Sequence, residues 1–117
     1  MLVVEDEPKL REIYRRNLTA AGFKVVAVED GVAALRYLEM NRPDAIVLDL
    51  SLPQLDGRDL HREIKAHPGL ADVPIVVVTG TNLDDLAPND FAALLTKPVD
   101  IDRVIQAVDQ AIRRTRS

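Results

Sequence analysis

The sequence Val47-Leu48-Asp49-Leu50-Ser51-Leu52-Pro53-Gln54-Leu55-Asp56-Gly57 joins the end of an apolar run to a loop marked by proline and glycine. The run begins at Ala45, and its length, its Val, Ile and Leu content and its turn-forming boundary predict a buried strand over residues 45–48. A strand without polar alternation is typical of a parallel sheet that is covered on both faces. Asp49 then lies at the carboxyl end of that strand, where open α/β sheets bind their ligands. Taken alone, Asp49 is explained equally well as a turn-forming aspartate.

Apolar runs alternate with helical periodicities along the rest of the chain, which indicates right-handed crossovers and a parallel sheet. Five such units in 117 residues predict one α/β domain over residues 1–117. We expect a doubly wound five-stranded parallel sheet in the flavodoxin-like order 2-1-3-4-5, with a crevice between the first and third strands. The other strands are predicted over residues 1–4, 23–28, 74–79 and 92–96. Helices are predicted from Pro8 to Gly22, from the cap Asp30 to about Asn41, over residues 58–66, and after the cap Asp100.

The composition excludes several classes of protein. The chain contains no cysteine, which rules out disulfides and thiolate chemistry and fits a reducing compartment, so we expect a cytoplasmic location. No apolar run approaches the roughly 18 residues that a membrane span needs, so we expect no membrane association. The net charge of -4, two Phe, two Tyr and no Trp also argue against direct nucleic-acid binding by this domain.

Residues that can do chemistry stand at the ends of four of the five predicted strands: Glu5 and Asp6, Asp49, Thr79, and Lys97. In a parallel sheet these ends lie on one edge. Carboxylates packed together repel and need a cation, and all-oxygen ligation with room for water suits Mg²⁺. An aspartate can act as a nucleophile and form an acyl phosphate, while Lys97 and the Thr79 hydroxyl neutralise or donate to the phosphoryl group.

Each of these residues also has an ordinary structural explanation. Glu5 and Asp6 suit the first turn of a helix, Thr79 suits a strand end, and Lys97-Pro98 suits a corner between a strand and a loop. The functional interpretation depends on finding all of them together at the ends of the right strands.

With these residues in place, the chain closely resembles the receiver domain of bacterial two-component response regulators, of the CheY-like superfamily. The matching blocks are Leu2-Val3-Val4-Glu5-Asp6-Glu7-Pro8, Leu48-Asp49-Leu50-Ser51-Leu52-Pro53 through Asp56-Gly57, Val77-Val78-Thr79-Gly80, and Leu95-Thr96-Lys97-Pro98. They occur in the family order at nearly the usual spacing and cover essentially the whole chain.

The resemblance implies a role for each matching residue. Asp49 would be phosphorylated by a histidine kinase or a phosphotransfer protein, and Lys97 would contact the phosphoryl oxygens. Thr79 would act as the switch hydroxyl. Asp6 would coordinate Mg²⁺ directly together with Asp49, with Glu5 nearby or acting through water. The backbone carbonyl of Ser51 would complete the metal ligands.

Two departures from the family pattern predict an atypical readout. The position three residues before the lysine usually carries an aromatic residue or a histidine coupled to the threonine, and here it is Leu94. The segment between Thr79 and Lys97 is also about one helical turn shorter than usual and contains Pro88. We expect the helix there to be short, displaced or absent. In most of the family that helix belongs to the dimerisation and output face, so a monomer and a phosphorylation-dependent dimer both remain open.

The leading hypothesis is a phosphoacceptor switch that controls an output domain or effector protein, and that is not an enzyme beyond assisting its own phosphorylation and dephosphorylation. The alternative is a pseudo-receiver, which binds proteins without using phosphate. A phosphatase of the haloacid-dehalogenase type needs a second Asp two residues after the nucleophile, where this chain has Ser51. A nucleotide- or flavin-binding protein needs a glycine-rich loop after the first strand, in place of Glu5-Asp6-Glu7-Pro8.

Overall fold

The computed structural model describes residues 1–50, 52, 57–80 and 91–116. Within them, five parallel strands form one sheet in the order β2-β1-β3-β4-β5, which confirms the predicted topology. The strands are β1 (Leu2–Val4), β2 (Val26–Val28), β3 (Ile46–Leu48), β4 (Ile75–Thr79) and β5 (Ala93–Thr96). The described helices are α1 (Pro8–Ala20), α2 (Gly31–Met40), α3 (Gly57–Ala66) and α4 (Ile101–Arg116).

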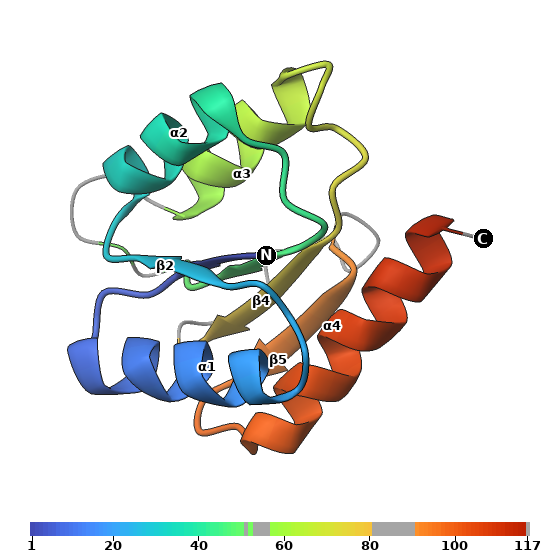
Figure 1. Ribbon diagram of the computed structural model, residues 1–117. Coiled ribbons are helices and arrows are strands. Elements are labelled where there is room, and N and C mark those ends of the chain that lie inside the picture. The colour runs from blue at the N-terminus through green and yellow to red at the C-terminus, as the bar shows by residue number, and fades with distance from the viewer. Residues whose placement is uncertain (51, 53–56, 81–90, 117) are drawn as a thin grey trace.

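Helices cover both faces of the sheet, with α2 and α3 on one side and α1 and α4 on the other (Figure 1). Successive strand residues point to opposite faces, so each strand contributes to two separate cores. In β1, Leu2 and Val4 belong to the core cluster that contains α2 and α3 residues, whereas Val3 belongs to the cluster with Leu18 of α1 and Val104 of α4. Burial on both faces is the reason why the strands lack polar alternation.

The strand register brings the chemically active residues to one edge. Val4 pairs with Val28 on one side and with Leu48 on the other, so Glu5 and Asp49 leave the sheet at the same level. At the other side of β3, the strands β4 and β5 end together, with Thr79 opposite Thr96. Thr79 and Lys97 therefore stand at the same carboxyl edge as the two acidic residues.

The element boundaries differ from the prediction by one residue at several ends, by two at the end of α1 and by three at the start of β2. The strand predicted over residues 23–28 contains only Val26–Val28, because the chain after α1 is still closing the helix end there. Gly22 has a φ of 103°, and the Phe23 amide donates to the Leu18 carbonyl at 3.1 Å. The segment 81–90, for which a short or absent helix was predicted, lies outside the described residues.

Carboxylates cap the starts of three helices. Glu7 accepts from the amides of Lys9 and Leu10 at the start of α1, and Asp30 accepts from the Ala33 amide at 2.8 Å. Asp100 likewise accepts from the amide of Asp102, at 3.0 Å, which agrees with the predicted caps at Asp30 and Asp100. None of the described helices combines the length and the apolar character that crossing a lipid bilayer requires.

Candidate phosphoacceptor and metal site

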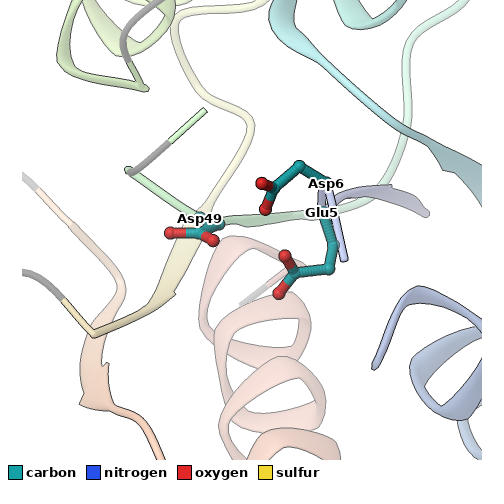
Figure 2. Close-up of side chains that lie close together, drawn as sticks. All are labelled: Glu5, Asp6 and Asp49. Atoms are coloured by element: carbon teal, nitrogen blue, oxygen red, sulfur yellow. The ribbon is translucent and has the colours of Figure 1, made fainter. Parts of the chain in front are cut away.

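Three carboxylates converge at the carboxyl edge of the sheet, as Figure 2 shows. Glu5 and Asp6 follow β1 and Asp49 follows β3, and one oxygen atom from each lies within 4.8 Å of the others. Glu5 and Asp49 are buried, with 1% and 4% of their surface exposed, while Asp6 is exposed to solvent. The cluster therefore has a buried floor and one carboxylate that faces the surrounding water.

Both oxygens of the Asp49 carboxylate accept hydrogen bonds from residues at the ends of β4 and β5. The hydroxyl of Thr79 donates to Oδ1 at 2.8 Å, and the ammonium of Lys97 donates to Oδ2 at 3.0 Å. Lys97 also donates to Oε1 of Glu5 at 2.7 Å, so that one cation joins the two buried acids. The structure thus brings together Glu5, Asp6, Asp49, Thr79 and Lys97, as the sequence predicted.

The pKa values of Glu5 and Lys97 are both raised in this site. Burial raises the pKa of Glu5 to about 7, even though its hydrogen bond from Lys97 acts in the opposite direction. For Lys97, burial alone lowers the pKa, but the hydrogen bonds to Glu5 and Asp49 outweigh it and hold the pKa above its usual value. Lys97 therefore stays charged at neutral pH, and the crowded acids are short of positive charge.

Gly57, the first residue of α3, fixes the backbone that follows Asp49. Its amide donates to the Leu50 carbonyl at 3.0 Å. A methyl group at this position would stand 2.4 Å from the Leu50 Cα and 2.8 Å from the Asp49 carbonyl oxygen. Only glycine allows α3 to begin so close to the β3 end, and this contact holds the Asp49 backbone in place.

Arg11 secures the loop that carries the other two acids, a role that its position in the sequence does not indicate. Its guanidinium donates from Nη1 to the backbone carbonyl of Glu5 at 3.0 Å and to that of Asp6 at 3.3 Å. The Glu7 amide donates to the Glu5 carboxylate at 3.2 Å. The spacing of Arg11 from the acids gives no clear sequence signal, whereas an acid directly before Pro8 is a recognisable helix start.

The donor set suits a hard divalent cation. All three acids offer oxygen atoms, Asp6 is open to water, and the 4.8 Å span is one that a single cation can draw together. Mg²⁺ prefers such oxygen ligands and keeps part of its water shell. The further ligand predicted at the Ser51 carbonyl lies outside the described residues. Leu94, at the position that is usually aromatic, is partly buried against the core cluster on the α2 and α3 side.

Comparisons with known proteins agree with this geometry. The model of the response regulator receiver domain family matches residues 1–109. Response regulator MprA of Mycobacterium sp. (strain KMS) is 36% identical over 119 residues, which cover 98% of this chain and 51% of that protein. The curated relatives are longer than this chain, which spans about a quarter to a half of their length.

Two similar solved structures contain magnesium. The receiver domain of a sensor histidine kinase from Pseudomonas aeruginosa, with a magnesium ion coordinated in the active site cleft, is 32% identical with a TM-score of 0.79 over 96% of this chain and 95% of that one. Response regulator protein TrrA from Thermotoga maritima, in complex with Mg²⁺ and BeF, is 26% identical with a TM-score of 0.83 over 94% of this chain and 96% of that one.

The strand order, the convergence of acids with Thr79 and Lys97, and a family match over nearly the whole chain agree with one another. The chain belongs to the response regulator receiver domain family.

Proposed function

We propose that this chain is a phosphoacceptor switch in a two-component phosphorelay, and that Asp49 receives the phosphoryl group. The observation that supports this most directly is the pair of contacts on Asp49, a hydroxyl at 2.8 Å and an ammonium at 3.0 Å. The donor would be the phosphohistidine of a sensor histidine kinase or a phosphotransfer protein. An output domain or an effector protein would then respond to the modified form.

In the proposed transfer, a carboxylate oxygen of Asp49 attacks the phosphorus of the phosphohistidine. The phosphorus–nitrogen bond breaks, and its electron pair stays on the imidazole nitrogen of the donor. The product is a mixed anhydride between the Asp49 carboxylate and phosphate. Lys97 then neutralises charge on the phosphoryl oxygens, and Thr79 turns its hydroxyl from Asp49 towards the phosphoryl group.

Mg²⁺ would be held by Asp6 and Asp49, with Glu5 beside them, and would supply positive charge opposite the phosphoryl oxygens. The residues present fit that ion because three carboxylates gather there, and Lys97 forms ion pairs with the two buried ones. Glu5 is buried and lies away from the solvent-exposed side of the cluster, which agrees with an indirect role in holding the metal ion.

This chain would therefore be a substrate and a switch, and an enzyme only in assisting its own phosphorylation and dephosphorylation. A pseudo-receiver that ignores phosphate would have no use for the paired contacts of Thr79 and Lys97 with Asp49, so we do not favour it.

The decisive experiment is intact mass spectrometry after incubation with Mg²⁺ and acetyl phosphate, which is a small phosphoryl donor. We expect one added phosphoryl group on the parent chain. The adduct should be absent from Asp49→Asn and absent when the metal is chelated. A parent chain that gains no mass under conditions where Mg²⁺ binding is detected would refute the proposal.

A further inference from the structure

Tyr14 has a buried hydroxyl that the mechanism above does not use. Only 2% of the residue is exposed, and its hydroxyl has no hydrogen-bond partner among the described residues. Buried polar groups are paired in the large majority of cases, and an unpaired one costs stability. A phenylalanine would fill the same volume without that cost, so the hydroxyl calls for an explanation.

Tyr14 lies close to the acidic site. Side chains on an α-helix lean towards its amino terminus, and the amino terminus of α1 lies directly after Glu5 at the carboxyl edge of the sheet. Tyr14 belongs to the core cluster that includes Val78 of β4 and Leu95 of β5, one and two residues before Thr79 and Lys97 respectively. This placement favours a hydroxyl directed from the core towards the carboxyl edge of the sheet, where the site is built.

The charges of the site act on the Tyr14 hydroxyl. Burial raises the pKa of Tyr14 to about 12, the Glu5 carboxylate adds to that rise, and Lys97 opposes it. Among the charged groups that influence Tyr14, Glu5 is the strongest, ahead of Lys97 and Asp49. The acid that acts most strongly on the Tyr14 hydroxyl is thus the same carboxylate that accepts a hydrogen bond from Lys97.

Lys97 cannot serve every acceptor equally once a phosphoryl group arrives. Its ammonium is committed at 2.7 Å to Glu5 and at 3.0 Å to Asp49, and the proposed function requires it to turn to phosphoryl oxygens. Glu5, which is 1% exposed, would then keep the Glu7 amide at 3.2 Å and the nearby charge of the proposed Mg²⁺, but it would lose Lys97, the side chain that donates to its Oε1. A buried carboxylate oxygen that loses its hydrogen-bond donor is destabilising unless another donor replaces it.

We propose that Tyr14 is a positioning residue whose hydroxyl donates a hydrogen bond to the Glu5 carboxylate when Lys97 turns to the phosphoryl group. This inference rests on the proposed function, because phosphorylation is what moves Lys97. This hydrogen bond stabilises the phosphorylated state and links the site to α1 through the protein interior. In a chain that carries Leu94 where the family usually has an aromatic residue, the response then includes an internal tyrosine.

The first test is a double-mutant cycle in urea that needs no phosphorylation. In the parent chain, Tyr14→Phe removes an unpaired hydroxyl, so the unfolding midpoint should stay level or rise. In a Lys97→Met background the hydroxyl has become the donor to Glu5, so the same change should lower the midpoint. Equal shifts of the midpoint in the two backgrounds would overturn the proposed contact.

The second test compares the affinity of Mg²⁺ and beryllofluoride, a phosphoryl analogue, for the parent, Tyr14→Phe and Tyr37→Phe. Tyr37 packs with the core on the opposite face and serves as the matched control. One hydrogen bond of ordinary net strength corresponds to about fivefold weaker binding in Tyr14→Phe, with no change in Tyr37→Phe. Equal affinities for all three chains overturn the role of Tyr14, while the phosphoryl adduct on the parent still supports the proposed function. No adduct and no beryllofluoride binding by the parent overturn both.

Discussion

Replacing Gly57 with alanine should both destabilise the chain and disturb Asp49. The added methyl group would stand 2.4 Å from the Leu50 Cα, 2.8 Å from the Asp49 carbonyl oxygen and 3.0 Å from the Leu50 carbonyl carbon. All three neighbours are backbone atoms, so no side chain can rotate away to make room. Either α3 shifts outward or the backbone between Asp49 and Leu50 moves.

Overpacking of this kind costs about 3 kcal/mol of unfolding free energy. For a chain of this size that loss lowers the melting temperature by about 12 °C. The displacement also moves the backbone of Asp49. We therefore expect the initial rate of phosphorylation by acetyl phosphate to fall at temperatures where the variant is still folded.

Two other glycines provide matched controls for urea unfolding and for the phosphorylation rate. A methyl group at Gly80 would meet no atom of the described residues within 4 Å, so Gly80→Ala should change the unfolding free energy by less than about 0.5 kcal/mol. Gly22 has equally open surroundings but a φ of 103°, so Gly22→Ala should cost about 1 kcal/mol without affecting phosphorylation. If Gly57→Ala proves as stable and as reactive as Gly80→Ala, the assignment of Gly57 as the support for Asp49 is wrong.

Three further predictions concern the site. Burial raises the pKa of Glu5 in the folded chain to about 7, from an ordinary value of 4.5, so the unfolded chain releases this proton at lower pH. The contribution of the Glu5 proton to the free energy of unfolding is therefore complete below pH 4.5 and is lost as the pH rises to about 7. Urea unfolding in the absence of metal should therefore show that decline in the parent and a smaller one in Glu5→Gln, and identical pH profiles would contradict it. Arg11→Met should weaken Mg²⁺ binding severalfold by releasing the carbonyls of Glu5 and Asp6, as measured by calorimetry, whereas an unchanged affinity would show that the loop is held by its other contacts. Thr79→Ala should leave the phosphoryl adduct intact and reduce the conformational response, and amide spectra that change on beryllofluoride binding as they do in the parent would refute its role as the switch.

The convergence of the site could be predicted from the sequence because it follows from topology. Parallel strands that alternate with helices place their carboxyl ends on one edge, so Asp49 and Lys97 had to meet the acids after β1. Continuous runs of apolar residues indicate buried strands, and Asp30 and Asp100 indicate the starts of helices. None of these inferences needs the position of any individual side chain.

The supporting contacts could not be predicted in the same way. In the sequence, Arg11 is one of several arginines on the polar side of a helix. Only the path of the loop after β1 brings the carbonyls of Glu5 and Asp6 within its reach. Tyr14 follows the apolar periodicity of α1, which predicts that the residue is buried but gives no information about its hydroxyl. The start of β2 depends on how the chain closes after Gly22, which is a matter of local backbone geometry. Ser51 and the segment 81–90 lie outside the described residues, so the predictions made there stand untested.

The span of sequence that Lys97 connects has a consequence for folding. Lys97 is separated from Asp49 by 48 positions and from Glu5 by 92, so its two ion pairs join the last strand of the sheet to the third and the first. Closing loops of that length costs entropy before the contacts repay it. The acids are also synthesised well before the lysine that joins them. Under the proposed function, the ability to receive a phosphoryl group should therefore appear only when the last strand has docked, so unfinished or partly unfolded chains would not accept it.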